Sequence, residues 1–179
     1  MTISFRPLAA DDLPKLAEWL GAPHVKEWWL EPDDLASVER RYLPMVQGLD
    51  TTEGFIVLLD GSPVGYIQRY RLADEPEWRR TVAVAVDGLE AAGIDYLIGD
   101  PSMVGRGLGA AAIGGFVAEL WEGLEDIRVV VVAVQQLNLP SWHALERVGF
   151  DRVWAGQLDT DDPGDQGPAF LYVRSRPPE

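Results

Sequence analysis

The residues best suited to chemistry form a glycine-rich loop near the middle of the chain. Residues 98–109 read Ile-Gly-Asp-Pro-Ser-Met-Val-Gly-Arg-Gly-Leu-Gly, and an alanine-rich segment that favours a helix follows. Glycines let the backbone approach an anion, and a helix start carries partial positive charge, so the loop can bind a pyrophosphate, with Arg106 as a cationic contact. Taken alone, the glycines could equally serve a tight chain reversal. The loop lacks the Lys-Ser/Thr pair of a Walker loop and the spacing of a dinucleotide-binding loop, which disfavours nucleotide hydrolysis and hydride transfer.

The charge and the composition narrow the chemistry further. The 29 acidic and 15 basic side chains give a formal charge of −14, a field that repels nucleic acid and attracts soluble cations. Excess carboxylates can also serve solubility alone, so the positions of the acidic residues have to decide between cation binding and solubility. With no cysteine and two histidines, thiolate nucleophiles and Cys-ligated metals are excluded, and we expect no metal site.

The elements that must position these residues fit one domain over residues 1–179, since 47% of the 179 residues are hydrophobic. No stretch reaches the ~20 apolar residues of a membrane span, and residues 1–7 do not resemble a secretion signal. We therefore expect a cytoplasmic protein with no nucleic-acid or membrane partner, either a monomer or a homodimer.

Sequence patterns in the first half predict helices before most strands. They indicate a strand over Thr2–Arg6, a helix from Asp11 or Asp12 to Leu20, an aromatic segment over 24–30, and a helix from Pro32–Asp34 to Val46. Gly54–Leu59 and Pro63–Tyr70 follow as a hairpin joined at Asp60-Gly61-Ser62. In the mixed region 72–92, residues 74–80 indicate a loop, and Thr81–Val86 a strand or a further loop.

The second half predicts a parallel crossover. It combines a strand over Gly93–Ile98, the glycine loop, a helix over Leu108–Gly123 and a buried strand over Ile127–Val134. A last helix over Asn138–Arg147, strands over Phe150–Leu158 and Ala169–Val173, and an acidic turn over Asp159–Gly167 complete an α/β domain with a mixed sheet.

Two motifs in this half resemble the GNAT superfamily of acetyltransferases. That family has a loop of the form Gln/Arg-x-x-Gly-x-Gly/Ala, which Val104, Gly107 and Gly109 match except at the first position. The run Asn138–Phe150 matches the family pattern Asn-x-x-(Ala/Ser)-x-x-x-(Tyr)-x-x-x-Gly-Phe.

The resemblance implies a fold and a cosubstrate. The fold would be an α+β GNAT domain with a mostly antiparallel sheet of six or seven strands, a parallel splay between the fourth and fifth strands, and about four helices. The cosubstrate would be acetyl-coenzyme A, held along the strand, the loop and the last helix by Leu97, Ile98, Val104, Gly105, Arg106, Gly107, Leu108, Gly109, Ala110, Asn138 and Ser141.

Further segments resemble the aminoglycoside 6′-N-acetyltransferases within this superfamily. They are Glu27-Trp28-Trp29, Arg41-Tyr42-Leu43-Pro44, Gly65–Tyr70 and Gly93-Ile94-Asp95, and the similarity extends over residues 6–174. The resemblance implies direct acetyl transfer, in a ternary complex, to the 6′-amine of an aminoglycoside antibiotic, which confers resistance.

That reaction needs a base, because the amine is protonated in water and must lose a proton before it attacks the thioester. Asp95 is the best candidate, although it could instead satisfy a strand-end hydrogen bond. A polycationic sugar also calls for carboxylates and flat aromatic rings. The expected substrate-binding residues are Glu27, Trp28, Trp29, Tyr42, Gln68, Asp74, Glu75, Trp78, Asp95 and Asp165.

The chain departs from the family pattern at three further positions. Leu145 stands where a tyrosine often protonates the leaving thiolate, so that role has no evident owner. Ala133 and Gln166 replace two frequent aspartates, and Asp165 could compensate for the second. We expect His24 and His143 to be structural or surface residues.

Three alternatives remain open. The acceptor could be another aminoglycoside amine, such as the 2′-amine of kasugamycin, or a lysine of siderophore assembly, although that branch carries histidine where Asp95 stands. The chain could also be a non-catalytic sensor that binds acyl-coenzyme A or a cationic ligand.

Overall fold

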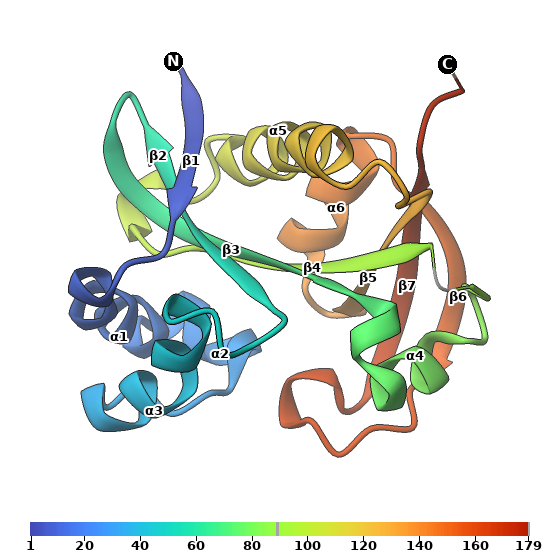
Figure 1. Ribbon diagram of the computed structural model, residues 1–179, viewed down its shortest axis with the longest axis horizontal. Coiled ribbons are helices and arrows are strands. Elements are labelled where there is room, and N and C mark those ends of the chain that lie inside the picture. The colour runs from blue at the N-terminus through green and yellow to red at the C-terminus, as the bar shows by residue number, and fades with distance from the viewer. Residues whose placement is uncertain (89, 179) are drawn as a thin grey trace.

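A computed structural model describes residues 1–88 and 90–178 as a seven-stranded sheet with helices on both faces (Figure 1). The strand order is β1-β2-β3-β4-β5-β7-β6. Within residues 1–88 and 90–178, only the β4–β5 pair is parallel; the other neighbours are antiparallel. The strands are β1 (Ile3–Pro7), β2 (Glu53–Leu59), β3 (Ser62–Arg71), β4 (Ala91–Ile98), β5 (Val129–Gln135), β6 (Asp151–Gln157) and β7 (Pro168–Ser175).

Six α-helices lie within the described residues, two more than the sequence patterns indicate. They are α1 (Leu13–Gly21), α2 (Pro23–Trp29), α3 (Leu35–Val46), α4 (Pro76–Val82), α5 (Leu108–Gly123) and α6 (Leu139–Arg147). The additional ones are α2 and α4, in the segments described above as aromatic and as loop. Each begins with a proline in its first turn, where the missing backbone N–H costs nothing. The suggested strand over Thr81–Val86 is wrong, because α4 extends to Val82 and a turn follows.

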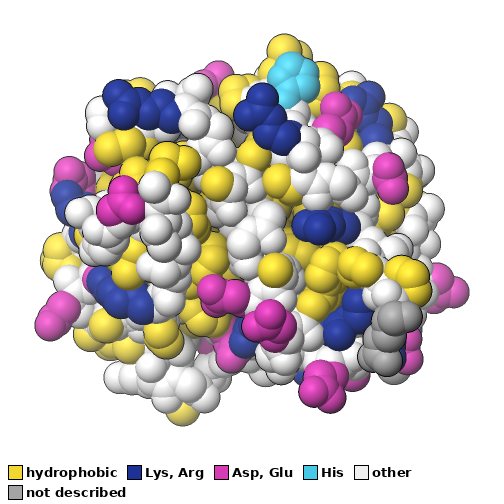
Figure 2. Space-filling view, turned by 90° about the horizontal axis from the view of Figure 1, so that it is seen from above, with side chains coloured by type: hydrophobic (Ala, Val, Ile, Leu, Met, Phe, Trp, Pro, Cys, Tyr) yellow, Lys and Arg dark blue, Asp and Glu magenta, His cyan; other side chains and the backbone are white. Residues whose placement is uncertain are grey.

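The helices divide between the two faces of the sheet. Apolar side chains of α5 and α6 form one core with the sheet, centred on residues such as Phe116 and Leu145. The helices α1, α2 and α3 pack on the opposite face around Leu16 and Tyr66, and a third cluster lies under α4. Seen from above in the view of Figure 1, basic and acidic side chains are interspersed over the surface (Figure 2).

Asp12, one of the two acidic residues expected to open α1, has another role. Asp12 receives two hydrogen bonds of 2.7 Å from the Arg6 guanidinium and one of 2.9 Å from the Ala9 amide, and its side chain does not cap α1. A bidentate pair with arginine is a strong charge-assisted contact, so it outcompetes the amides of the helix. Asp34 does cap α3, since its carboxylate accepts from the Ser37 amide.

The parallel crossover and the hairpin are as predicted. The chain passes from β4 through α5 to β5, and β2 and β3 are joined at Asp60 and Gly61, both with positive φ. The β4–β5 pairing is short: it joins Ala91–Gly93 to Val129–Val131 and then stops. Figure 1 shows β4 crossing the picture while β5, β7 and β6 stand steeply to it, so the sheet opens between β4 and β5.

Candidate active site

A cavity of about 210 Å³ lies where β4 and β5 diverge. Its walls are Ile94, Asp95 and Tyr96 of β4, Val132 to Gln135 of β5, and Asn138 and Ser141 at the start of α6. The remaining lining residues come from α2 and the residues after it, from α3, from β3 and from the turn between β6 and β7: Trp28, Trp29, Glu31, Arg41, Gln68, Asp162, Gly164 and Asp165. Residues from seven parts of the sequence therefore converge on the opening in the sheet.

Asp95 is the carboxylate that β4 presents to this cavity. Gln68, opposite it in the β3–β4 register, donates a hydrogen bond of 2.8 Å from Nε2 to Oδ2 of Asp95. Oε1 of the same Gln68 amide accepts a hydrogen bond of 2.8 Å from the Tyr66 hydroxyl, and this second bond fixes the orientation of Gln68. Burial raises the pKa of Asp95 to about 6, against the opposing effect of the Gln68 bond. A carboxylate with this pKa is ionised near neutral pH, yet accepts a proton readily.

A second carboxylate, Asp165, faces the same cavity from the acidic turn between β6 and β7. Burial and the charges of Asp95 and Asp162 raise its pKa to about 7. The turn is fastened to β5, because Gln135 Nε2 donates a hydrogen bond of 2.8 Å to the Gly164 carbonyl. Within the turn, the Asp162 carboxylate accepts a hydrogen bond of 2.8 Å from the Gly164 amide. Carboxylates that disfavour one another's ionisation favour a bound cation, so this side of the cavity suits an ammonium group.

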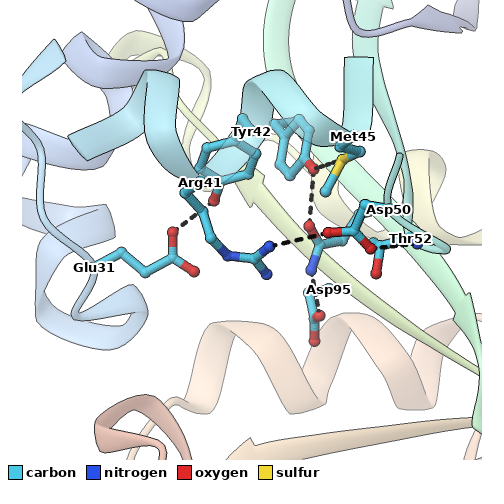
Figure 3. Close-up of polar contacts among 9 residues, drawn as sticks. Glu31, Arg41, Tyr42, Met45, Asp50, Thr52 and Asp95 are labelled. Atoms are coloured by element: carbon cyan, nitrogen blue, oxygen red, sulfur yellow. Dashed lines mark hydrogen bonds and ion pairs between the residues drawn. The ribbon is translucent and has the colours of Figure 1, made fainter. Parts of the chain in front are cut away.

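Two charged residues of the cavity, Glu31 and Arg41, were not assigned a role from sequence. Figure 3 shows the Arg41 guanidinium between Glu31 and Asp50, and Arg41 Nη1 lies 3.6 Å from Asp50 Oδ2. Glu31 accepts a 2.6 Å hydrogen bond from the Tyr42 hydroxyl. Local sequence spacing does not reveal these roles, because α3 and the segment before it come close to β4 only in the folded domain.

The expected substrate-binding residues separate into two groups. Trp28, Trp29, Gln68, Asp95 and Asp165 line the cavity. Five others do not line it: Glu27, Tyr42, Asp74, Glu75 and Trp78.

The reason differs among these five. Tyr42 is 1% exposed, so its ring offers no face to a ligand, and its contribution is the hydrogen bond to Glu31. Trp78 packs against the cluster under α4, Glu27 is exposed on α2, and Asp74 lines a separate cavity beside β2 and β3. Glu75 lies near enough to Asp50 that this charge, after burial, raises its pKa.

The glycine loop has the geometry of an anion site. Gly107 is the residue before α5 and has a φ of +76°, and Gly105 has a φ of +79°; both values favour glycine. Within the described residues, no side chain caps α5, so the amides of its first turn point outward from Leu108, Gly109 and Ala110. Arg106 and Val104 are exposed beside them, and Arg147 Nη1 would lie 3.4 Å from a Cβ at Gly107. This set of groups fits a pyrophosphate.

The other expected cofactor contacts lie at the end of β4 and at the start of α6. Asn138 caps α6 and lines the cavity with Ser141, whose Oγ lies 2.7 Å from the Tyr96 hydroxyl. Leu97 is buried, and the Ile98 carbonyl is bonded to His24 Nε2 at 2.8 Å, which gives His24 the structural role expected for it. The His143 ring contacts the Trp142 ring in an edge-to-face arrangement. Leu145 is fully buried, and Gln166 is exposed while its neighbour Asp165 reaches the cavity.

Over residues 1–88 and 90–178, no group of three or more acidic or histidine side chains could hold a metal ion. No helix in these ranges is long and apolar enough to cross a membrane.

The chain is similar to known proteins over nearly its whole length. A sequence profile described as an acetyltransferase (GNAT) domain matches residues 9–158. Aminoglycoside N(6')-acetyltransferase type 1 of Klebsiella pneumoniae is 30% identical over 180 residues, which cover 98% of this chain and 84% of that protein. The protein of the same name from Serratia marcescens matches with the same values.

Solved structures agree with these sequence matches. The crystal structure of aminoglycoside acetyltransferase AAC(6')-Ib in complex with coenzyme A has a TM-score of 0.83 at 29% identity, over 98% of this chain and 95% of that chain. A structure of AAC(6')-Ib in complex with ribostamycin and coenzyme A also has a TM-score of 0.83 at 29% identity, over 98% and 94%.

Proposed function

This chain belongs to the GNAT acetyltransferase family, and we propose that it transfers an acetyl group from acetyl-coenzyme A to the 6′-amine of an aminoglycoside. The observation that carries this proposal is the Asp95 carboxylate, which has a pKa of about 6 and faces a cavity at the β4–β5 opening. The relatives named for this activity, which match 98% of the chain, support the choice of substrate. The reaction would inactivate an antibiotic and so confer resistance, in the cytoplasm, where acetyl-coenzyme A is available.

The two ends of the proposed site would hold the two substrates together in a ternary complex. Acetyl-coenzyme A supplies an activated acetyl thioester. The first-turn amides of α5, with Gly105 and Gly107, would bind its pyrophosphate, and Asn138 would contact it nearer the cavity. Asp165 and the ring of Trp28 or Trp29 would bind the cationic sugar on the other side.

The chemical role of Asp95 follows from its position and its pKa. It would accept one proton from the substrate ammonium, which frees the nitrogen lone pair for attack on the acetyl carbonyl. Gln68, held by Tyr66, would keep the carboxylate in place while it does so. Because Asp95 is ionised above about pH 6, this step can run at neutral pH.

The proposal is tested by thiol release from acetyl-coenzyme A with kanamycin, tobramycin, kasugamycin or lysine as the acceptor. We expect turnover with kanamycin and tobramycin, and mass spectrometry and NMR of the product should place the acetyl group on the 6′-nitrogen. Turnover with kasugamycin alone would indicate a 2′-amine acceptor, and turnover with lysine alone a siderophore enzyme. Binding of acetyl-coenzyme A without turnover on any amine would favour a sensor.

A further inference from the structure

The leaving group of the proposed reaction needs a stabilising contact. As the C–N bond forms and the C–S bond breaks, the electron pair of the C–S bond stays on sulfur, and coenzyme A departs as a thiolate. A hydrogen-bond donor placed at that sulfur lowers the barrier, because it acts where negative charge develops. Leu145 of α6 is fully buried and has no polar atom in its side chain. The donor has to come from another position.

Among the residues that line the cavity, only Tyr96 and Ser141 carry a hydroxyl group. Tyr96 follows Asp95 directly on β4, and neighbouring residues of a strand point to opposite faces of the sheet. Asp95 is bonded to Gln68 and, through it, to Tyr66, which packs with α1 and α3. Tyr96 packs with the core under α5 and α6. A thioester inserted between β4 and β5 would therefore have Asp95 on one side and Tyr96 on the other.

The Tyr96 hydroxyl is held at this place by α6. It lies 2.7 Å from Ser141 Oγ, and either oxygen can be the donor. Ser141 is itself fixed in the first turn of α6, where its amide donates to the Asn138 side chain. If Ser141 donates to the phenol oxygen, the phenol hydrogen is free to point into the cavity.

We propose that the Tyr96 hydroxyl donates a hydrogen bond to the thioester sulfur as coenzyme A leaves, with Ser141 as the residue that positions it. This assignment rests on the proposed function. The amine nitrogen loses two protons in all, the first to Asp95 and the second to solvent, and the thiolate takes up one proton from solvent, so atoms and charge balance. The acceptor amine and the departing sulfur would be served by adjacent residues of one strand.

The electrostatics of Tyr96 agree with a donor that keeps its proton. Burial raises the pKa of the Tyr96 hydroxyl above its usual value, so the group stays neutral through the pH range in which the enzyme would work. Hydrogen bonds to an ionised acceptor are among the stronger ones, so a thiolate gains more from this contact than the neutral thioester does. That difference between ground state and transition state is what accelerates a reaction.

The test measures the thiol of bound coenzyme A, which requires binding but no turnover. Thiolate absorbance in the ultraviolet gives the pKa of this thiol in the complex, for the full-length wild type and for Tyr96→Phe. We expect the pKa of the bound thiol to be about one unit higher in Tyr96→Phe, a tenfold change in its ionisation constant. Turnover should fall about tenfold as well, with little change in the KM for acetyl-coenzyme A.

Two variants complete the design. Ser141→Ala retains the phenol but loosens it, so it should shift the pKa of the bound thiol in the same direction by less. Tyr172→Phe removes a hydroxyl bonded to Glu146 and Arg152, outside the cavity, and should leave the thiol unchanged. An unchanged pKa of the bound thiol in Tyr96→Phe would overturn the inference while acetyl transfer by the wild type stands. Failure of the wild type to bind coenzyme A would instead overturn the proposed function.

Discussion

Replacing Asp95 by asparagine should make the protein more stable while it abolishes most of its activity. The carboxylate is partly buried, and burial disfavours its charged form, which is the form that the proposed reaction needs. Asparagine has nearly the same shape, and its side-chain oxygen can still accept the hydrogen bond from Gln68. The substitution therefore removes an unfavourable charge and leaves the surrounding contacts in place.

The pKa of Asp95 gives the size and the sign of the effect. A rise from the ordinary value of 3.8 to about 6 corresponds to roughly 3 kcal/mol at pH 8, at about 1.4 kcal/mol per unit. The folded state keeps the proton up to about pH 6, whereas the unfolded state releases it near pH 4. The wild type thus loses stability relative to the variant as the pH rises from about 4 to 6, and the difference is constant above that. At pH 5 the difference in stability between the variant and the wild type should be about half of its value at pH 8.

Calorimetric melting of the ligand-free proteins at pH 8 and pH 5 measures this difference. In a domain of this size we expect Asp95→Asn to raise the Tm by roughly 6–12 °C at pH 8, while turnover falls about 100-fold or more. Asp12→Asn is the matched control. The Arg6 guanidinium lowers the pKa of Asp12, so removal of the Asp12 charge should destabilise the protein at pH 8. If Asp95→Asn melts at or below the wild-type temperature at pH 8, burial does not raise this pKa, and the case for Asp95 as a base poised near neutral pH fails.

Three other outcomes follow from the site. The kcat/KM for acetyl transfer should fall about tenfold per unit below pH 6, as Asp95 is protonated, and a flat rate profile down to pH 5 would exclude it as the base. Gly107→Val should weaken coenzyme A binding in calorimetry, whereas Gly61→Val, at a hairpin turn with a similar φ of +83°, should cost stability alone; equal affinities would contradict the loop assignment. Asp165→Asn should raise the KM for an aminoglycoside by roughly tenfold without changing that for acetyl-coenzyme A; steady-state kinetics with both substrates checks this.

Local patterns in the sequence were enough to predict the elements on either side of the glycine loop. The crossover from β4 to β5 depends on a run of buried β-branched residues and on glycines before a helix, and both signals are local. The hairpin at Asp60 and Gly61 is equally local, because its turn requires positive φ at both positions. The position of the glycine loop between β4 and α5 was therefore predicted correctly from the sequence.

The helices α2 and α4 were missed for a physical reason. Each has only seven residues, too short for a periodic apolar face to be recognised, and each is stabilised by packing against the rest of the domain. The one local signal was the proline at the start, since Pro23 both ends α1 and opens α2.

The composition of the cavity was predictable only in part. Asp95 could be found because it lies on a strand that leads into the glycine loop. Arg41 reaches the cavity from α3, and Glu31 reaches it from the segment before α3. Tyr42, the residue after Arg41, is buried and donates a hydrogen bond to Glu31. Which side of a helix faces a cavity formed by distant strands depends on tertiary packing, which no local spacing encodes.

The opening between β4 and β5 links the stability of the protein to its chemistry. Within the described residues, the two strands stop pairing after Gly93 and Val131, and Gly93 lies under the Tyr70 ring, which passes 2.3 Å from where a Cβ would be. Where two strands stop pairing, their backbone amides and carbonyls need other hydrogen-bond partners, because unpaired backbone groups are unfavourable in a folded interior. The amide-rich arm of coenzyme A can supply them. We expect the broken pairing and the buried charge of Asp95 to lower the stability of the ligand-free protein. Binding of the two substrates would relieve both effects. The rise in Tm on ligand binding should therefore be larger in the wild type than in Asp95→Asn.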